Sequence, residues 1–476
     1  METTSKSPGL VRGLGLWSAT AIVIGSMIGT AIFLVPSEIS RDVGSVAQVV
    51  AVWLIGGVMV LFGAFCYAEM GAAMPEAGGD YVYLTRGLGS LWGFLFGWMT
   101  AMIQRPASAA TIAAGLLRFA GFIFPMATAR IFTWHIPVPF RAERLQLTFT
   151  AAQWWAAAMI ATMVAINYLG VRNAGRVQTI LTGLKVAAIA SIVVLGLTLG
   201  KISGNHSPPL ATHPAHGALA AFLAALVPVM FAYYGFGALG TVGGEILSPQ
   251  KNIPRAIIVG MLSVVGLYTL LNLVYLRVLG FSQVVQSEHV ASDVAALLAG
   301  ASGAKWLTVA MMTSALGTLH ANFLTGPRVS YAMARDGKFF RFAQRIHPVF
   351  HTPSGALVFQ GCVAILLVLT GTYEELYSLM LFAIGIFFML TAAALIRLRT
   401  KEPALPRPYR AWGYPFTPLI FAAGALAMSA NLWLVRPMRS SIGLAVILLG
   451  IPFFYHWRRR AAIRSSLAEA ASPAGS

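Results

Sequence analysis

The sequence predicts an all-α membrane protein with about 12 transmembrane helices. Of its 476 residues, 58% are hydrophobic and only 10% are charged, whereas about a quarter of the residues are charged in a soluble protein. The apolar residues also gather in runs of about 20 residues or more, the length that a helix needs to cross a bilayer. Composition and run length therefore both place most of the chain inside a membrane.

The apolar runs follow one another along the chain. They lie near residues 14–38, 46–74, 89–124, 150–169, 174–200, 219–246, 255–280, 304–334, 355–372, 376–397, 413–435 and 440–457. The runs at 89–124 and 304–334 are longer than one bilayer is thick, so we expect these helices to be tilted or to extend into water. Between the second and third runs, Pro75 and Gly78 predict a turn, which is followed by a short interfacial helix.

The distribution of basic residues predicts the orientation in the membrane. Lys and Arg number 33 against 15 Asp and Glu, a formal net charge of +18. In a soluble protein this excess would favour nucleic-acid binding. In a membrane protein it marks the cytoplasmic loops, so we expect no nucleic-acid partner. The basic residues of the predicted inside loops and C-terminal tail are Arg172, Arg176, Lys251, Arg255, Arg335, Lys338, Arg341, Arg345, Arg397, Arg399, Lys401, Arg407, Arg410, Arg458, Arg459, Arg460 and Arg464. Both termini are therefore predicted to be cytoplasmic, with the chain in the inner membrane of the cell.

Two of the predicted spans are interrupted by glycine. The first contains Gly25 and Gly29, and the sixth contains Gly235 and Gly237. Clustered small residues can also reflect close packing between membrane helices. Two interruptions five spans apart, in a chain that could hold a 5+5 repeat, instead indicate an inverted repeat with a binding site near the midplane of the membrane.

A broken helix exposes backbone groups that an unbroken helix pairs internally. The N–H groups at the start of one half-helix can hold a carboxylate, and the carbonyl groups at the end of another can hold an ammonium. A zwitterion such as an amino acid fits both. Phe231 and Phe236, beside the second break, could close over an apolar side chain.

With this repeat the chain divides into five regions. We expect a cytoplasmic N-terminal tail at 1–13, the first five-helix repeat at 14–200, the second, inverted repeat at 201–397, transmembrane helices 11 and 12 at 398–458, and a cytoplasmic C-terminal tail at 459–476.

A few charged residues lie within the apolar runs. Lys185 sits about a dozen residues beyond the inside end of its span, too deep for easy snorkelling. An intramembrane lysine is costly and therefore indicates a functional role. Arg105 is also intramembrane, Glu69 and Arg328 form a candidate ion pair, and His320 is interpreted as a buried interior residue.

The sequence contains no motif of a soluble enzyme. It has neither the phosphate-binding loop of nucleotide triphosphatases nor a cluster with metal-ligand spacing. Its two cysteines, Cys66 and Cys362, both lie within apolar runs. We therefore expect no enzymatic activity, no cofactor and no bound metal.

Several motifs together resemble those of a known family. They are the segments 25–33, Tyr67-Ala68-Glu69-Met70-Gly71, 78–83, Arg105-Pro106, Gly170-Val171-Arg172, 231–236, Ile253-Pro254-Arg255-Ala256 and 405–410. In combination they resemble the L-type amino acid transporter branch of the amino acid–polyamine–organocation superfamily, over about residues 10–440. The resemblance implies twelve spans, a LeuT-type 5+5 inverted repeat with helices 1 and 6 broken, and sodium-independent uptake or exchange of amino acids.

The resemblance also implies which residues bind the substrate. The backbone N–H groups of Gly29, Thr30 and Ala31 would hold the carboxylate. The carbonyl groups of Met27, Phe231 and Tyr234 would hold the amine, with the Phe231 ring as a lid. The sequence departs from the family at three places. Gly29-Thr30-Ala31 replaces the usual Gly-Ser-Gly, Phe236 replaces a common tryptophan, and Tyr234 replaces a smaller or acidic residue.

A lysine of the family corresponds to Lys185. It would bridge the carbonyl of Gly25 to the hydroxyl of Ser314, in the place that a sodium ion fills in sodium-coupled relatives.

A sodium-independent exchanger or uptake system for neutral amino acids is the function that these features favour. The alternatives are a proton-coupled symporter of amino acids or of polyamines and other organic cations, a membrane amino acid sensor, and a channel. A sensor should carry a soluble signalling domain, and a channel should show a continuous polar stripe. Animal relatives bind a heavy chain through a loop cysteine, and because this sequence has no cysteine between 125 and 149, we expect no disulfide-linked partner.

Overall fold

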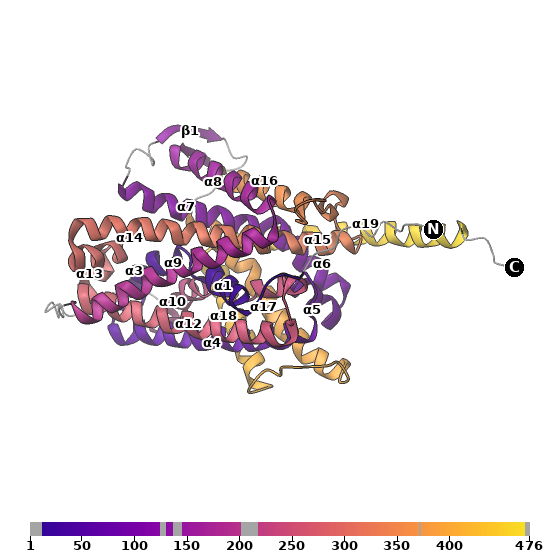
Figure 1. Cartoon of the computed structure of the whole chain (residues 1–476), viewed down its shortest axis with the longest axis horizontal. Coiled ribbons are helices and arrows are strands. Elements are labelled where there is room, and N and C mark those ends of the chain that lie inside the picture. The colour runs from indigo at the N-terminus through magenta and orange to yellow at the C-terminus, as the bar shows by residue number, and fades with distance from the viewer. Residues whose placement is uncertain (1–11, 124–129, 137–144, 201–217, 371–372, 472–476) are drawn as a thin grey trace.

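The computed structural model describes residues 12–123, 130–136, 145–200, 218–370 and 373–471. Its helices form one bundle, in which α4, α9, α12 and α14 run side by side along the long axis (Figure 1). The first half of the described chain contains α1 (Leu16–Met27), α2 (Ala31–Leu34), α3 (Pro36–Val43), α4 (Val46–Ala73), α5 (Asp80–Gly87), α6 (Ser90–Met99), the π-helix η1 (Thr100–Gln104), α7 (Arg105–Ile123), β1 (Arg130–Ile136), β2 (Leu145–Thr150), α8 (Ala151–Tyr168) and α9 (Val171–Thr198).

The second half of the described chain is also helical. It contains α10 (Ala218–Ala232), α11 (Ala238–Thr241), η3 (Gly243–Glu245), α12 (Pro249–Leu279), α13 (Phe281–Gln286), α14 (Val290–Thr325), α15 (Pro327–Arg335), η4 (Arg341–Gln344), α16 (Ser354–Thr370), α17 (Tyr373–Lys401), α18 (Phe416–Val435) and α19 (Pro437–Ala471). The last turns of α19 project beyond the bundle at the end where α15 and α6 lie, and α13 lies at the opposite end (Figure 1).

The helices have the composition of membrane spans. Within the described residues, eight helical segments are long and apolar enough to cross a bilayer, and two shorter apolar helices cover Ala221–Ala232 and Ser354–Leu369. The long run near 89–124 is built from α6, η1 and α7 in direct succession. The protein is therefore a multi-pass membrane protein, and the count of 12 spans stays a prediction.

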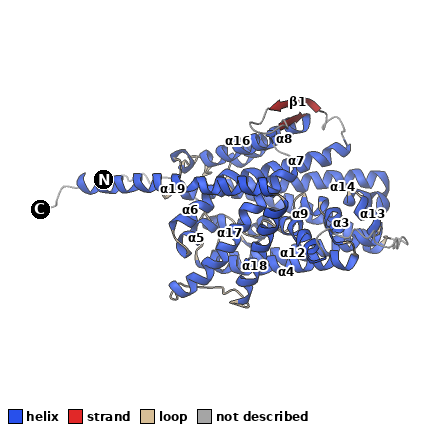
Figure 2. Ribbon diagram, turned by 180° about the vertical axis from the view of Figure 1, so that it is seen from behind, coloured by secondary structure: helices blue, strands red, loops and turns tan. Residues whose placement is uncertain are grey.

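The prediction of an all-α chain was wrong at one place. Strands β1 and β2 pair antiparallel, with Phe132 opposite Phe149 and Trp134 opposite Leu147. Figure 2 shows this hairpin at the edge of the helical bundle, beside α7 and α8. Both strands are rich in β-branched and aromatic residues, which favour extended backbone. The apolar runs alone do not predict this hairpin, because the strands lie in the segment that joins the runs near 89–124 and 150–169.

The proposed pairing of Glu69 with Arg328 was also wrong. Glu69, near the end of α4, accepts a hydrogen bond from Nε of Arg399 at 2.9 Å and lies 3.4 Å from Nε of Arg407. Arg328 instead contacts Glu245 of η3, with Nε 2.9 Å from Oε1. Each carboxylate is buried, so each needs a cation close by. The two pairs fix α4 to the end of α17 and α15 to the segment after α11.

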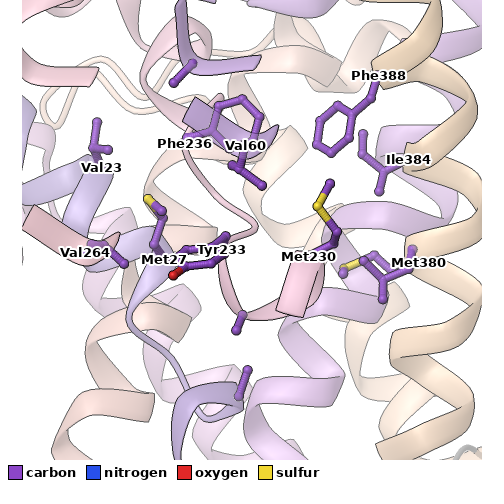
Figure 3. Close-up of a cluster of buried hydrophobic side chains, with 14 of the residues drawn as sticks. Val23, Met27, Val60, Met230, Tyr233, Phe236, Val264, Met380, Ile384 and Phe388 are labelled. Atoms are coloured by element: carbon purple, nitrogen blue, oxygen red, sulfur yellow. The ribbon is translucent and has the colours of Figure 1, made fainter. Parts of the chain in front are cut away.

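The largest hydrophobic cluster surrounds the places where helices are interrupted. Figure 3 shows side chains from α1, α4, α10, α12 and α17 that meet there, among them Met27, Met230 and Ile384. Because the surrounding helices pack against both interrupted segments, the irregular backbone lies in the interior of the bundle. Such backbone is tolerated at membrane depth only where it is buried in protein or borders a cavity.

Candidate functional site

The first interruption separates α1 from α2. Helix α1 ends at Met27, and the backbone of Ile28 is extended, with φ −73° and ψ 90°. Helix α2 begins at Ala31, and Val35 keeps helical angles and joins it to α3. The last carbonyl groups of α1 and the first N–H groups of α2 therefore have no partner within their own helix. The predicted break in the first span is present.

The second interruption lies between α10, which ends at Ala232, and α11, which begins at Ala238. Gly235 has φ +127°, in the region that favours glycine, and an added Cβ there would lie 2.6 Å from the carbonyl oxygen of Ser26. No side chain fits in that space. Glycine at 235 therefore lets the two interrupted segments cross in direct contact. The glycine pattern within one span could not predict this contact, because it involves residues of two spans.

Lys185 of α9 binds the first interruption. Its Nζ donates to the carbonyl oxygens of Gly25 at 3.0 Å and Ile28 at 2.7 Å, and to the hydroxyl of Thr318 at 2.9 Å. The predicted contact with Gly25 is present, but the hydroxyl partner is Thr318 and not Ser314. Ser314 lies one turn earlier on α14, and its hydroxyl donates to the same Ile28 carbonyl at 3.3 Å.

A buried cavity lies where the two interruptions meet. Its volume is about 40 Å³, counted as space for the centres of water molecules. It is lined by Ser26, Met27, Gly29, Thr30, Ala31, Arg105, Ser108, Ile112, Phe231, Tyr234, Gly235, Thr318 and Asn322. All but one of the predicted substrate-binding residues are therefore brought to one cavity.

The exception is Phe236, which lies outside this cavity. Its ring packs against Tyr67 at 5.1 Å and Phe388 at 5.6 Å between ring centroids, and Figure 3 shows it beside Phe388. The positive φ of Gly235 reverses the direction of the chain between Tyr234 and Phe236. As a result Tyr234 borders the cavity while Phe236 joins the aromatic core.

Two of the three carbonyl groups predicted to bind the amine already accept a hydrogen bond from the protein. The hydroxyl of Tyr268 donates to the carbonyl of Met27 at 3.0 Å, and the N–H of Tyr234 donates to the carbonyl of Phe231 at 3.1 Å. A carbonyl oxygen has two lone pairs and can accept a second donor. These first partners help to fix the positions of both carbonyls.

Seven residues of the cavity wall were not predicted to line the site. Ser26 and Gly235 belong to the interrupted segments, and the others come from α7 and α14, namely Arg105, Ser108, Ile112, Thr318 and Asn322. Arg105 stood out in the sequence as an intramembrane charge, and that signal could have placed it at the site. Its Nη1 donates to Thr325 at 3.1 Å, and among the described residues its buried Nε has no hydrogen-bond partner.

The π-helix η1 positions the side of the cavity formed by the third predicted span. The hydroxyl of Thr100 donates to Oε1 of Gln104 at 2.7 Å, and Nε2 of Gln104 donates to the hydroxyl of Tyr234. This chain of contacts links η1 to the second interruption. Short π-helical turns are rare and are common at functional sites, and no residue pattern in the sequence had indicated one here.

The amino acid permease family matches this chain over residues 14–454. The chain belongs to that family. The permease is 31% identical to a serine/threonine exchanger of Bacillus subtilis (strain 168), over 95% of this chain and 98% of the relative. It is 31% identical to Asc-type amino acid transporter 1 of Mus musculus, over 96% of this chain and 83% of that one. It is 30% identical to large neutral amino acids transporter small subunit 2 of Homo sapiens, over 95% of this chain and 82% of that one.

Proposed function

We propose that this permease is a sodium-independent secondary transporter of neutral amino acids, which works by exchange or uptake through alternating access. The observation that carries the proposal is the cavity at the crossing of the two interrupted segments. Residues at the start of α2 and at the ends of α1 and α10, where helices leave backbone N–H and carbonyl groups without intrahelical partners, line the same small space. A site with donors on one side and acceptors on the other suits a zwitterion. The names of the three relatives, an exchanger and two amino acid transporters, support this class of substrate.

The wall chemistry favours neutral amino acids over organic cations. Among the described residues that line the cavity there is one charged side chain, the cation Arg105, and no Asp or Glu. A polyamine or another multiply charged cation would need buried carboxylates to replace its water. Proton-coupled uptake stays the second candidate mechanism for the same substrates.

Proteoliposomes test the function directly. Purified protein should take up labelled alanine or serine without sodium, and uptake should be faster when the vesicles contain unlabelled substrate if the mechanism is exchange. Uptake that is driven by an imposed proton gradient into empty vesicles would instead favour symport. No uptake of any neutral amino acid in either format would contradict the proposed function.

We further propose twelve spans in a LeuT-type 5+5 repeat, with the protein in the inner membrane and both termini in the cytoplasm. The positions of the interruptions, in the first and sixth predicted spans, support the repeat. Neither cysteine lies between 125 and 149, so we propose no disulfide-linked heavy chain.

The orientation gives a testable prediction. A reporter fused after Ser476 should lie in the cytoplasm, because Arg458, Arg459 and Arg460 follow the last apolar segment. The green fluorescent protein fusion should therefore be fluorescent and the alkaline phosphatase fusion inactive. Paired fusions of alkaline phosphatase and green fluorescent protein provide the measurement. A fusion that is active only in the periplasm would contradict the orientation.

The residues at positions 31 and 234 predict a preference for small side chains. Alanine and serine should compete with labelled alanine much better than leucine or phenylalanine, because Ala31 and the Tyr234 ring both line the cavity and narrow it. Inhibition constants for the four amino acids check this. Tighter competition by leucine or phenylalanine would reverse the prediction.

A further inference from the structure

A second cavity lies beside the one described above. Its volume is about 20 Å³ on the same measure. It is lined by Tyr67, Asp80, Phe96, Gln104, Arg105, Tyr234, Gly235, Gly237, Ala238, Thr241, Ile384 and Phe388. Three of these residues, Arg105, Tyr234 and Gly235, also line the first cavity. They therefore form the wall between the two spaces.

Tyr234 supplies the bulk of this wall. Gly235 has no side chain, and Arg105 is held toward α14 by its hydrogen bond to Thr325. The hydroxyl of Tyr234 accepts a hydrogen bond from Gln104, and the centroid of its ring lies 6.3 Å from the centroid of the Phe388 ring. A shorter side chain at 234 would remove the ring and leave the two cavities continuous.

The far wall of the second cavity is apolar. Phe96 comes from α6, and Ile384 and Phe388 come from α17. The one carboxylate that lines it, Asp80, accepts hydrogen bonds at Oδ1 from the hydroxyls of Tyr67 and Thr391, at 2.5 and 2.7 Å. That carboxylate is held by protein partners, so the surface left for a ligand is mainly aromatic and aliphatic.

We propose that the second cavity is a closed subsite for the side chain of larger amino acids, and that Tyr234 excludes them by filling its entrance. The inference rests on the proposed function. In this permease the substrate side chain ends at the Tyr234 ring, which restricts transport to small amino acids. With a small residue at 234 the side chain of leucine reaches the surface formed by Phe96, Ile384 and Phe388.

The test compares Tyr234→Ala with Tyr234→Phe. Affinities of alanine and leucine are measured by competition for labelled alanine, and the readout is their ratio, which does not depend on the amount of active protein. In Tyr234→Ala the ratio should shift toward leucine by about ten- to fiftyfold, because the three extra carbons of leucine become buried against apolar side chains. Tyr234→Phe keeps the ring and loses only the contact with Gln104, so its ratio should stay that of the wild type.

A double variant tests whether the gained affinity for leucine comes from the second cavity. Adding Ile384→Phe to Tyr234→Ala fills the second cavity and should abolish most of the gain for leucine. If Tyr234→Ala does not fold, Tyr234→Val carries the same test with a smaller expected shift.

The possible outcomes separate the two proposals. If Tyr234→Ala binds alanine but its ratio is unchanged, or if Ile384→Phe leaves the gain intact, the subsite proposal is wrong and amino acid transport still stands. If the wild type already binds leucine as tightly as alanine, Tyr234 excludes nothing and the proposal is also wrong. If the wild type binds no amino acid, the proposed function itself fails.

Discussion

Alanine should compete for the site more than about a hundredfold better than alaninol, alaninamide or N-acetylalanine. Each analogue removes one ionic group, so either the N–H groups at the start of α2 or the carbonyls of Met27 and Phe231 lose their charged partner. In a buried site, charge-assisted hydrogen bonds contribute about 1.5–3 kcal/mol each, and a loss of about 3 kcal/mol weakens binding more than a hundredfold. Inhibition constants for uptake of labelled alanine provide the measurement. An analogue that competes as well as alanine would show that the substrate is not held by the two interruptions.

Substitutions at Gly29 test the same prediction. A Cβ at this position would meet Thr318 at 3.4 Å, an ordinary contact, so Gly29→Ala should fold and serve as the matched control. Gly29→Val adds two methyl groups in the space assigned to the carboxylate and should weaken alanine binding much more than Gly29→Ala does. Equal effects of the two substitutions would place the carboxylate elsewhere.

Lys185→Ala should reduce transport to about 1% of the wild-type rate or less, while wild-type transport should be unaffected by removing sodium. The ammonium is buried and donates three hydrogen bonds, two of them to carbonyls freed by the interruption of the first span. Hydrogen bonds to a charged group contribute about 1.5–3 kcal/mol each, and their acceptors would lose this partner. Initial uptake rates in sodium and in choline buffers, normalised to folded protein, provide the measurement.

A pair of hydroxyl variants tests the geometry around Lys185. Thr318 contacts the ammonium and Ser314 does not, so Thr318→Val should impair transport more than Ser314→Ala. A strict sodium requirement in the wild type would contradict the role given to Lys185.

The sequence was sufficient to predict which backbone segments are interrupted and that Lys185 is an unusual intramembrane charge, because glycine clusters and a lone lysine are visible without knowledge of packing. The contact of Lys185 with Gly25 was predicted from the resemblance to the family. The choice between Ser314 and Thr318 could not be made in this way. The two residues lie one turn apart on the same face of α14, and which hydroxyl reaches Lys185 is decided by how α14 packs against α9.

The other errors have the same origin in contacts between distant segments. Phe236 is adjacent to cavity residues in sequence, yet the backbone angle of Gly235 turns it into the core. Glu69 and Arg328 have opposite charges, yet Arg399 and Glu245 lie closer to them. The hairpin of β1 and β2 is different, because its residues carried a local signal for strands that the focus on apolar runs left unused.

An experimental structure with bound L-alanine would test the central claim most directly. The account predicts the carboxylate within about 3 Å of backbone N–H groups between Gly29 and Ala31, and the ammonium at a similar distance from the carbonyls of Met27 and Phe231. Lys185 should keep its contact with Gly25, with no metal ion between them. Alanine bound away from the crossing of the two interrupted segments, or a sodium ion in the place of the Lys185 ammonium, would contradict it.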